Sequence, residues 1–417
     1  MPSCARRSVK RMKPKPQADS PAAIVVGGEA NALSVARSLS AAGIAVYSLN
    51  HPTTRLRYSR ACRLIALEDD NGGPKAWADF LVGPRSDHLR GAVILACSDE
   101  AIEMIIAHRP VLAEKFILEE GDGEMRLSLL DKLRTYVKAV EAGIPTPRYW
   151  RVRTVADLEG IKDELVFPLI IKPLFSHHTR KIWPQGKYLK VHGYDDLHRN
   201  FSDLQKHRVE FLLMEFVPGD DQLLCSYYTY MDENGDPLFH FTKRVIRRFP
   251  ENMGEACYHI TDWDPDVRDM GLKLFRHVKL RGLGNVEFKR DRRDGKLKII
   301  ECNARFTAAN SLVKKSGLDL ALLTYNKLTG RPLPALDRYR SGLTLWLPMA
   351  DYLAFKALRQ QGRMSFGGWV LNVLRPHCLP FLSWRDPLPS FAGWWRKVRR
   401  MAGARPVQPK GDTAPVR

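Results

Sequence analysis

The sequence has no long apolar run. No stretch of its 417 residues approaches the roughly 20 apolar residues that a membrane-spanning helix needs. Residues 1–16 carry six Lys and Arg, but the apolar segment of a secretory signal peptide does not follow them. The 44% hydrophobic and 27% charged content is that of a globular protein. These absences predict a cytoplasmic protein.

Cysteine is also scarce, and the positions of the cysteines show no paired spacing. The seven cysteines are odd in number, scattered, and form no close pair. A disulfide framework and a zinc site both need paired spacings, so neither is expected.

A dinucleotide fingerprint is missing as well. Gly27 and Gly28 follow an apolar segment, but the sequence GGEANA lacks the G-x-G-x-x-G spacing. The next apolar segment ends at Asn50 and His51 rather than at an acid. We therefore interpret the two glycines as a structural turn and disfavour a nicotinamide-dependent oxidoreductase.

The apolar patterns that are present predict two architectures in succession. Segments 22–26, 44–49 and 92–96 suit buried strands, and a helical pattern between the first two makes a βαβ unit with a parallel sheet. After residue 130 we expect a helix over 131–142, strands at 167–173 and 211–217, and two hairpins. Those hairpins turn at Asn234-Gly235 and Asp294-Gly295. The fold class is α/β followed by α+β.

The second hairpin carries two acids and an amide. Glu301 and Asn303 are two residues apart on one strand, so they share a face, and pairing through the turn can bring Glu287 beside them. Two carboxylates and an amide oxygen form the kind of oxygen site that Mg²⁺ prefers. The alternative is an exposed acidic hairpin balanced by its neighbouring Lys and Arg.

Several further features surround this hairpin in the sequence. Lys172 ends an apolar strand, which would hold its ammonium rigidly for a phosphate. Residues 214–221 (MEFVPGDD) offer backbone groups that could pair with a purine, followed by acids for ribose hydroxyls. Arg305 places a guanidinium two residues after Asn303.

Together these segments resemble the ATP-grasp superfamily over about residues 131–330. The matching pieces, in the family's order, are DK at 131–132 with AGIPTP at 142–147, FPLIIKP at 167–173, MEFVPGDD at 214–221, VEF at 286–288 and ECNAR at 301–305. Within the superfamily, the chain looks most like carboxylate–amine ligases of the D-aspartate ligase type. The resemblance implies a Rossmann-like pre-ATP-grasp domain (21–130) after a disordered basic arm (1–20). A two-lobed ATP-grasp domain (131–330) and a basic, Trp-rich C-terminal extension (331–417) with a disordered end would follow.

The resemblance also implies the role of each site residue. ATP phosphates would contact Lys132 and Lys172, adenine would contact the backbone of Glu215 and Val217, and ribose would contact Asp221. Mg²⁺, with Mn²⁺ as an alternative, would bind Glu287, Glu301 and Asn303, and Arg305 would lie near an acyl-phosphate. A further family arginine has four competitors here, Lys243, Arg244, Arg247 and Arg248, of which we choose Arg247. Asp221 is shorter than the family's usual glutamate, and Ala304 replaces a common proline.

Three further features of the sequence have competing interpretations. His177 and His178 lack a third metal ligand, which favours a mobile loop over ATP. Cys302 should point away from the metal ligands into the core. In residues 331–417, fifteen Lys and Arg stand against four acids, and five tryptophans are mixed among them. Residues 341–400 would therefore contact an anionic membrane surface at its inner face or a lipid-linked substrate, or form a helical appendage packed on the body.

The function implied by the resemblance is ATP-dependent ligation of a small-molecule carboxylate to an amine through an acyl-phosphate. The alternative is a non-catalytic ATP-binding module at a membrane surface. Binding of nucleic acid is disfavoured, because no aromatic-basic recognition motif accompanies the basic ends. The identity of both substrates and the oligomeric state are left open.

Overall fold

The computed structural model describes residues 20–67, 73–174, 188–206, 210–334, 336 and 339–392. The predicted basic arm, apart from Ser20, lies outside these ranges. His177, His178, Trp394 and Trp395 also lie outside them.

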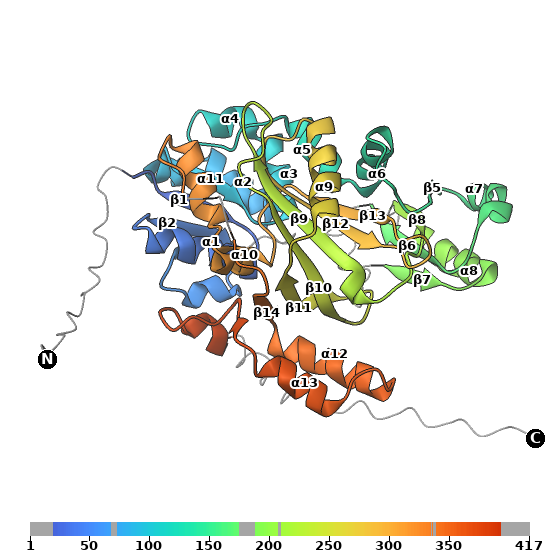
Figure 1. Cartoon of the computed structure of the whole chain (residues 1–417). Helices are drawn as coiled ribbons and strands as arrows, with labels where there is room; N and C mark the ends of the chain where they lie inside the picture. Colours follow the sequence, from blue (N-terminus) through green and yellow to red (C-terminus); the bar gives the residue numbers. More distant parts are fainter. Residues whose placement is uncertain are drawn as a thin grey trace, which may run out of the picture.

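The N-terminal part is a parallel sheet of order β3-β2-β1-β4 (Figure 1). Ala23 and Val25 pack with helix α1 on one face, while Ile24 and Val26 pack with α2 to α4 on the other. Burial on both faces explains why the strands are continuously apolar and confirms the predicted βαβ opening. The elements are β1 (Ala23–Val26), α1 (Ala30–Ala41), β2 (Val46–Asn50), β3 (Arg63–Ala66), α2 (Pro74–Val82), β4 (Val93–Ala96), α3 (Asp99–Ala107) and α4 (Arg109–Ala113).

The glycine turn after β1 is tightly packed. Gly28 has a positive φ of 74°, and a Cβ there would lie 2.7 Å from the carbonyl oxygen of Cys97. The predicted structural role of this turn is confirmed, because only glycine allows β1 and β4 to end so close together.

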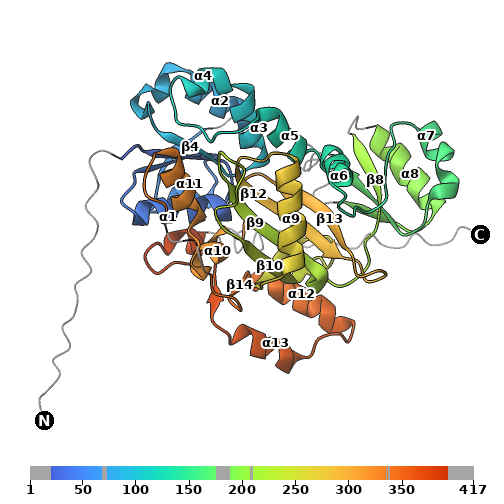
Figure 2. The ribbon, with the colours of Figure 1, turned by 45° about the horizontal axis from the view of Figure 1, so that its top comes forward.

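A small lobe follows, built on an antiparallel sheet of order β5-β8-β6-β7. Its core contains Leu169, Ile171 and Leu213 from the strands, packed against α7 and α8. In Figures 1 and 2 it lies at the opposite end of the molecule from the N-terminal sheet. The elements from the connection onward are α5 (Gly123–Leu130), α6 (Lys132–Glu141), β5 (Tyr149–Arg151), α7 (Val155–Gly160), β6 (Leu169–Pro173), β7 (Leu189–Val191), α8 (Tyr194–Gln205) and β8 (Phe211–Glu215).

Between these two parts lies a seven-stranded sheet of order β13-β12-β9-β10-β11-β14-β15. Helix α9 packs on one face so closely that a Cβ on Gly271 would lie 2.3 Å from the ring of Tyr227. Both predicted hairpins are present as β9–β10 and β12–β13. The elements are β9 (Leu224–Met231), β10 (Phe241–Phe249), β11 (Glu255–Thr261), α9 (Pro265–His277), β12 (Gly282–Arg290), β13 (Leu297–Asn303), α10 (Asn310–Ser316) and α11 (Leu320–Leu328).

The C-terminal segment is joined to this sheet. Strand β14 (Thr344–Trp346) pairs with β11, and β15 (His377–Cys378) pairs with β14. Between them, α12 (Pro348–Gln360) and α13 (Phe366–Val373) lie together at the foot of the molecule in Figure 1. Part of the predicted extension is therefore built into the sheet. No helix in the described ranges is long and apolar enough to cross a membrane.

Two buried aspartates anchor the C-terminal segment. Asp351 accepts from Arg247 at 2.6 and 3.2 Å and from the indole N–H groups of Trp346 and Trp369 at 3.0 Å each. Asp386 pairs with Arg37 of α1 at 2.9 Å. These contacts fix α12 to β10 and the last described residues to the N-terminal domain.

We expect Asp351→Ala to lower the free energy of unfolding by about 3–5 kcal/mol, because it leaves the buried Arg247 charge without its partner. Urea denaturation measures the change. Asp262→Ala removes an exposed partner of Arg244 and should cost about 1 kcal/mol or less. Equal losses in the two variants would contradict the anchoring role of Asp351.

Candidate functional site

The predicted acidic hairpin brings its two carboxylates directly opposite each other. Glu287 of β12 pairs with Glu301 of β13, and Asn285 pairs with Asn303 in the same antiparallel ladder. The amide of Asn303 donates to Asn285 Oδ1 at 3.3 Å. The expected proximity of Glu287, Glu301 and Asn303 is thus confirmed, and their role as metal ligands stays a prediction.

These acids belong to a row of side chains that crosses the sheet. Glu301 pairs with Glu287, Glu287 with Ser226 of β9, and Ser226 with Lys243 of β10. Paired residues project from the same face, so the row places two carboxylates, a hydroxyl and an ammonium side by side. Lys243 donates to Ser226 Oγ at 3.1 Å. Burial lowers the pKa of Lys243, and the charges of Glu287 and Glu301 oppose that shift.

A β-bulge directs a further cation to this row. The pairing of β12 with β13 shifts register after Glu287, because Phe288 pairs with Ile299 and Ile300 is left over. The carbonyl of Ile300 accepts from Lys172 Nζ at 3.4 Å and from the Tyr136 hydroxyl at 3.0 Å. Lys172 is 5% exposed and ends β6. Its ammonium therefore lies next to the backbone of Glu301.

Lys132 lies close to the same region. It is the first residue of α6 and is buried, and its Nζ donates to the carbonyl of Leu174, just beyond β6, at 2.9 Å. Asp131 caps this helix by accepting from the N–H groups of Leu133 and Arg134. The aspartate of the DK pair thus holds the helix end that carries the lysine.

Of the two residues predicted to offer backbone groups to adenine, Glu215 already donates its N–H to the carbonyl of Arg148 at 2.8 Å. The carbonyl of Val217 accepts from Lys289 Nζ at 3.0 Å. The backbone N–H of Val217 donates to no described residue. Lys289 also donates to the carbonyl of Gly219 at 2.8 Å, and burial lowers its pKa to about 8. The Val217 N–H is therefore held in place and available to an acceptor.

Glu215 at the end of β8 is fixed by cations. It pairs with Arg293 at 2.6 Å and with Lys298 at 3.4 Å, and it accepts from the N–H of Arg148 at 3.1 Å. Burial raises the pKa of Glu215. These contacts lower the pKa by a larger amount, so the net shift is downward. The carboxylate is thus charged and committed to protein contacts.

Asp221 is likewise committed. Its carboxylate accepts from the N–H and Nε of Arg248 at 2.9 and 2.7 Å and from the N–H of Asn252 at 3.0 Å. In this geometry Asp221 ties η4 (Asp221–Leu223) to the end of β10. A ribose contact would share these oxygens with three donors.

Arg305 reaches from the sheet to the N-terminal domain. Its guanidinium pairs with both carboxylate oxygens of Asp99, the first residue of α3. Burial lowers the pKa of Arg305, but Asp99 and Glu301 raise it more, and the net shift is upward. Asn31 reinforces the same junction by donating to the carbonyls of Cys97 and Phe306 at 2.6 and 2.8 Å. Both sets of contacts join the segment after β13 to α1 and α3.

Arg247, chosen from the sequence as a further site residue, is engaged elsewhere. It forms the buried pair with Asp351 and stacks over Tyr258, 4.4 Å from the ring centre. Lys243, one of its competitors, is the cation in the row. Hairpin symmetry could have distinguished them, because Ser226 and Lys243 are equidistant from the Asn234-Gly235 turn.

Sequence reasoning also missed His259 of β11. It is 7% exposed, and its Nδ1 has no hydrogen-bond partner among the described residues. Burial lowers its pKa well below the usual value, so the ring is neutral at neutral pH. His259 is two residues from Thr261, which pairs with Lys243, so both lie on the face of the row. No local sequence motif indicates that His259 lies on this face.

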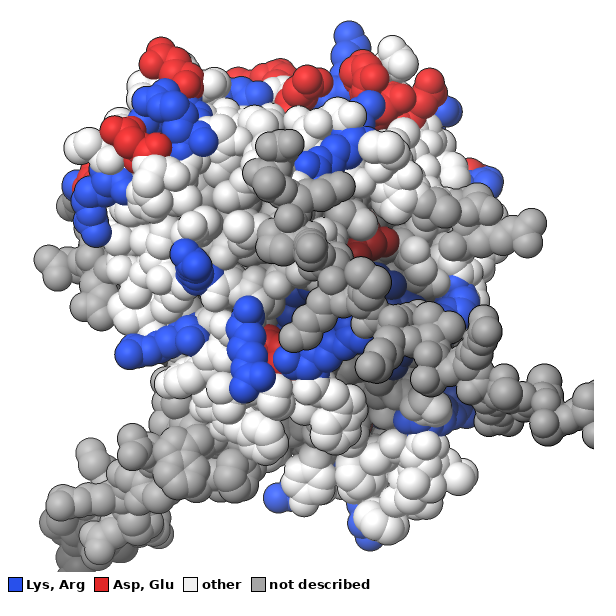
Figure 3. All heavy atoms as spheres, turned by 90° about the vertical axis from the view of Figure 1, so that its left-hand side faces the viewer, with Lys and Arg blue, Asp and Glu red and all other residues white. Residues whose placement is uncertain are grey.

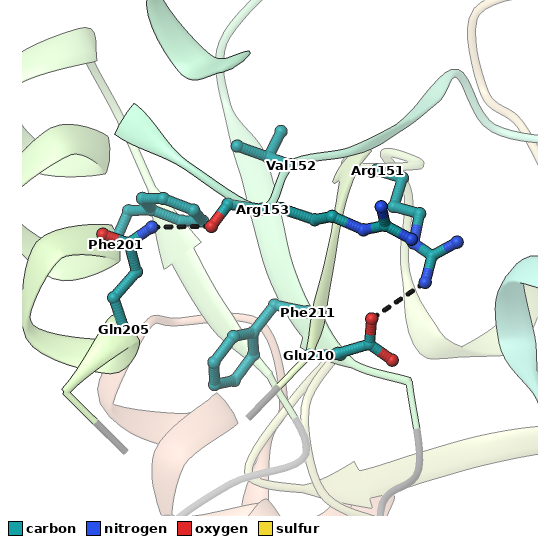
Figure 4. A pocket seen from close by; sticks show the side chains of 7 residues that line it. All are labelled: Arg151, Val152, Arg153, Phe201, Gln205, Glu210 and Phe211. Atoms are coloured by element: carbon teal, nitrogen blue, oxygen red, sulfur yellow. Dashed lines mark hydrogen bonds and ion pairs between the residues drawn. The ribbon is translucent and has the colours of Figure 1, made fainter. Parts of the chain in front are cut away.

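A separate pocket lies at the edge of the small lobe (Figure 4). It is lined by Phe201, Phe211 and the ion pair of Arg151 with Glu210 at 2.8 Å, and Gln205 donates to the carbonyl of Arg153. These contacts satisfy its polar groups with one another. The pocket contains none of the residues of the acidic row.

Comparisons with known proteins found partial sequence matches. Residues 260–336 match the family model described as the carbamoyl-phosphate synthase L chain, ATP binding domain. A D-aspartate ligase of Enterococcus faecium is 25% identical over 263 residues, which are 59% of this chain and 61% of that ligase. A D-alanine–D-alanine ligase of Xylella fastidiosa is 24% identical over 46% of this chain and 64% of its own length. The chain thus covers less than two thirds of either ligase.

Solved structures show the same fold. The biotin carboxylase domain of a Hydrogenobacter thermophilus 2-oxoglutarate carboxylase, complexed with MgADP, ADP and bicarbonate, has a TM-score of 0.61 at 15% identity, covering 77% of this chain and 73% of that chain. The chain has an ATP-grasp-like fold. An L-amino acid ligase of Bacillus licheniformis has a TM-score of 0.55 at 16% identity, covering 76% of this chain and 75% of its own. These likenesses show the ATP-grasp fold alone.

The oxygen atoms of the row suit a hard divalent cation. Glu287 and Glu301 face each other at adjacent positions, and Asn303 adds an amide on the same face. Nowhere in the described ranges do three His, Cys, Asp or Glu side chains form a metal cluster. Two carboxylates and one amide would therefore supply only part of an Mg²⁺ shell, and phosphate oxygens and water commonly supply the rest.

Proposed function

We propose that this ATP-grasp protein is an ATP-dependent carboxylate–amine ligase that works through an acyl-phosphate. The observation that carries the proposal is the row of Glu301, Glu287 and Lys243, with Lys172 beside it. Carboxylates for a metal and cations for phosphoryl oxygens are what this chemistry asks of a protein. The named D-aspartate and D-alanine–D-alanine ligases support the choice of reaction class.

The nucleotide would lie between the small lobe and the large sheet. The Val217 N–H would donate to the adenine, and Lys289 would hold that backbone segment in position. Glu215, fixed by Arg293, would shape the adenine site, with Asp221 at the ribose. Lys132 and Lys172, whose ammonium groups donate to the carbonyls of Leu174 and Ile300, would neutralise phosphate oxygens.

Glu287, Glu301 and Asn303 would hold Mg²⁺, which when bound draws together phosphate oxygens and neutralises their charge. Lys243 lies on the far side of Glu287 in the row, with Ser226 between them, so its ammonium would meet the substrate end of the transferred group. Arg305 would do the same from the side of the N-terminal domain.

The proposed reaction has two balanced steps. A substrate carboxylate oxygen attacks the γ-phosphorus of ATP, the bond to the β–γ bridging oxygen breaks, and ADP leaves. The amine nitrogen then attacks the acyl carbon, the C–O bond to phosphate breaks, and the nitrogen loses a proton. No protein nucleophile is needed. The predicted core position of Cys302 agrees, because burial raises the pKa of its thiol and keeps it protonated.

Glu301→Gln tests the proposed metal site. We expect ADP release, measured across a panel of amino acids and acyl acceptors with Mg²⁺, to fall by about 100- to 1,000-fold, because one stabilising charge is lost. Glu255→Gln, at an exposed position of β11 in the same sheet, should keep wild-type turnover.

Unchanged turnover in Glu301→Gln would contradict the site. Substrate-independent binding of ATP without ADP release by the wild type would instead favour the non-catalytic ATP-binding module.

Lys243→Met tests which cation serves the reaction. We expect turnover to fall by about 100-fold or more, since the buried ammonium of the row is lost. The double variant Arg247→Met/Asp351→Asn removes both charges of the buried pair while keeping an acceptor for the two tryptophan N–H groups. It should retain turnover within about threefold, since neither charge is left unpaired. Thermal unfolding checks that both proteins are folded. Loss of turnover in the double variant with retention in Lys243→Met would instead assign the site cation to Arg247.

A further inference from the structure

We propose that α12 and α13 form a surface that docks on an anionic lipid membrane. This inference does not rest on the proposed ligase activity. The α12–α13 surface is defined by six exposed apolar or aromatic side chains: Met349, Tyr352, Leu353, Phe366, Leu371 and Leu374.

Helix α12 is apolar on its outer side as well as its inner side. Ala354 and Phe355 are buried. Met349, Tyr352 and Leu353 are 47%, 48% and 38% exposed, and their spacing of three and four residues puts them on one stripe. A surface helix of a globular protein usually carries polar residues there. Lys356 continues the stripe one turn later.

Helix α13 has no buried residue. Phe366, Val370 and Leu374 recur every fourth residue and therefore form one stripe, with Leu371 beside it. Leu371 and Leu374 are 68% and 75% exposed. Apolar side chains in this number on one short helix exceed the scattered exposure that is normal for a surface.

The exposed side chains are held by an ordered support. Trp369 of α13 stacks on Phe355 of α12 with ring centres 4.7 Å apart, and its indole N–H donates to the buried Asp351. Ser365 caps α13 by accepting from the N–H of Gly368. The outward stripes are therefore presented by a fixed helix pair.

Most charged side chains of the segment that forms this surface are cations. Residues 347–392 contain five Lys and Arg and only two acids, Asp351 and Asp386. Both acids are buried in ion pairs, with Arg247 and Arg37. Of the cations, Arg363 pairs with Asp220 and Glu251 outside this segment. In Figure 3 most Asp and Glu gather near the top, and most coloured side chains in the lower half are Lys and Arg.

Apolar side chains fringed by cations match the chemistry of an anionic membrane interface. There, the apolar groups enter the acyl boundary and the cations meet lipid phosphates. A second copy of the chain would bring the same positive fringe against itself. A nucleic acid would satisfy the cations but leave the leucines in water. The combination therefore favours a lipid surface.

Vesicle flotation of the whole chain tests this inference. We expect the chain to float with phosphatidylcholine vesicles that contain about 30% phosphatidylglycerol, and to bind pure phosphatidylcholine at least about tenfold more weakly. Leu371→Glu/Leu374→Glu should lower binding to the anionic vesicles by about tenfold or more. The matched control is Val140→Glu/Val166→Glu, at two exposed valines on other parts of the chain, and it should bind as the wild type does.

Absence of wild-type flotation, equal binding to neutral vesicles, or wild-type binding by the leucine variant would each overturn the inference. So would a wild-type dimer that the leucine variant converts to monomer, since a second copy would then be the occupant. ADP release without vesicles should be equal in both glutamate variants, which separates this outcome from failure of the ligase proposal.

Discussion

Two carboxylates facing each other across one strand pair set the conditions for the rest of this structure. Glu287 and Glu301 are neighbours in a largely buried sheet, where like charges repel more strongly than in water. Such an arrangement is sustained by cations, and the structure supplies them from three directions. Lys243 comes along the sheet, Lys172 comes from the small lobe, and Arg305 comes from the boundary with the N-terminal domain. The proposed Mg²⁺ and the phosphates of ATP would complete this balance of charge.

The same balance explains why the parts of the chain are tied together as they are. Arg305 is oriented by Asp99, so the N-terminal part of the chain determines where this guanidinium points. In the middle of the sheet, the Arg247–Asp351 pair fastens helix α12 to β10. Neither contact needs a ligand. Both link their elements directly to the large sheet or to the segment that follows it.

Much of this arrangement could be predicted from local sequence. The βαβ opening, the Asp131 cap and the two hairpins depend on neighbouring residues, and hydrophobic period and turn chemistry are enough to find them. The facing of Glu287 and Glu301 also follows from a hairpin, although the bulge at Ile300 that adjusts their register has no local signature. The predicted roles of the site residues stay proposals.

What could not be predicted depends on contacts between distant parts of the chain. Arg247 and Asp351 are 104 residues apart, and no local pattern around Arg247 indicates that it pairs with a buried acid. Strands β14 and β15 are too short to have a pattern of their own, and they exist because β11 offers an edge. The pairing of Arg305 with Asp99 joins residues 206 positions apart, which no local pattern connects.

The central claim is that the row of charges activates a carboxylate by phosphorylation. The most direct measurement uses a carboxylate substrate labelled with ¹⁸O in both oxygens, chosen from those that elicit ADP release. The account predicts that one labelled oxygen appears in the released phosphate and the other stays in the amide product. Release of unlabelled phosphate together with an amide product would contradict it.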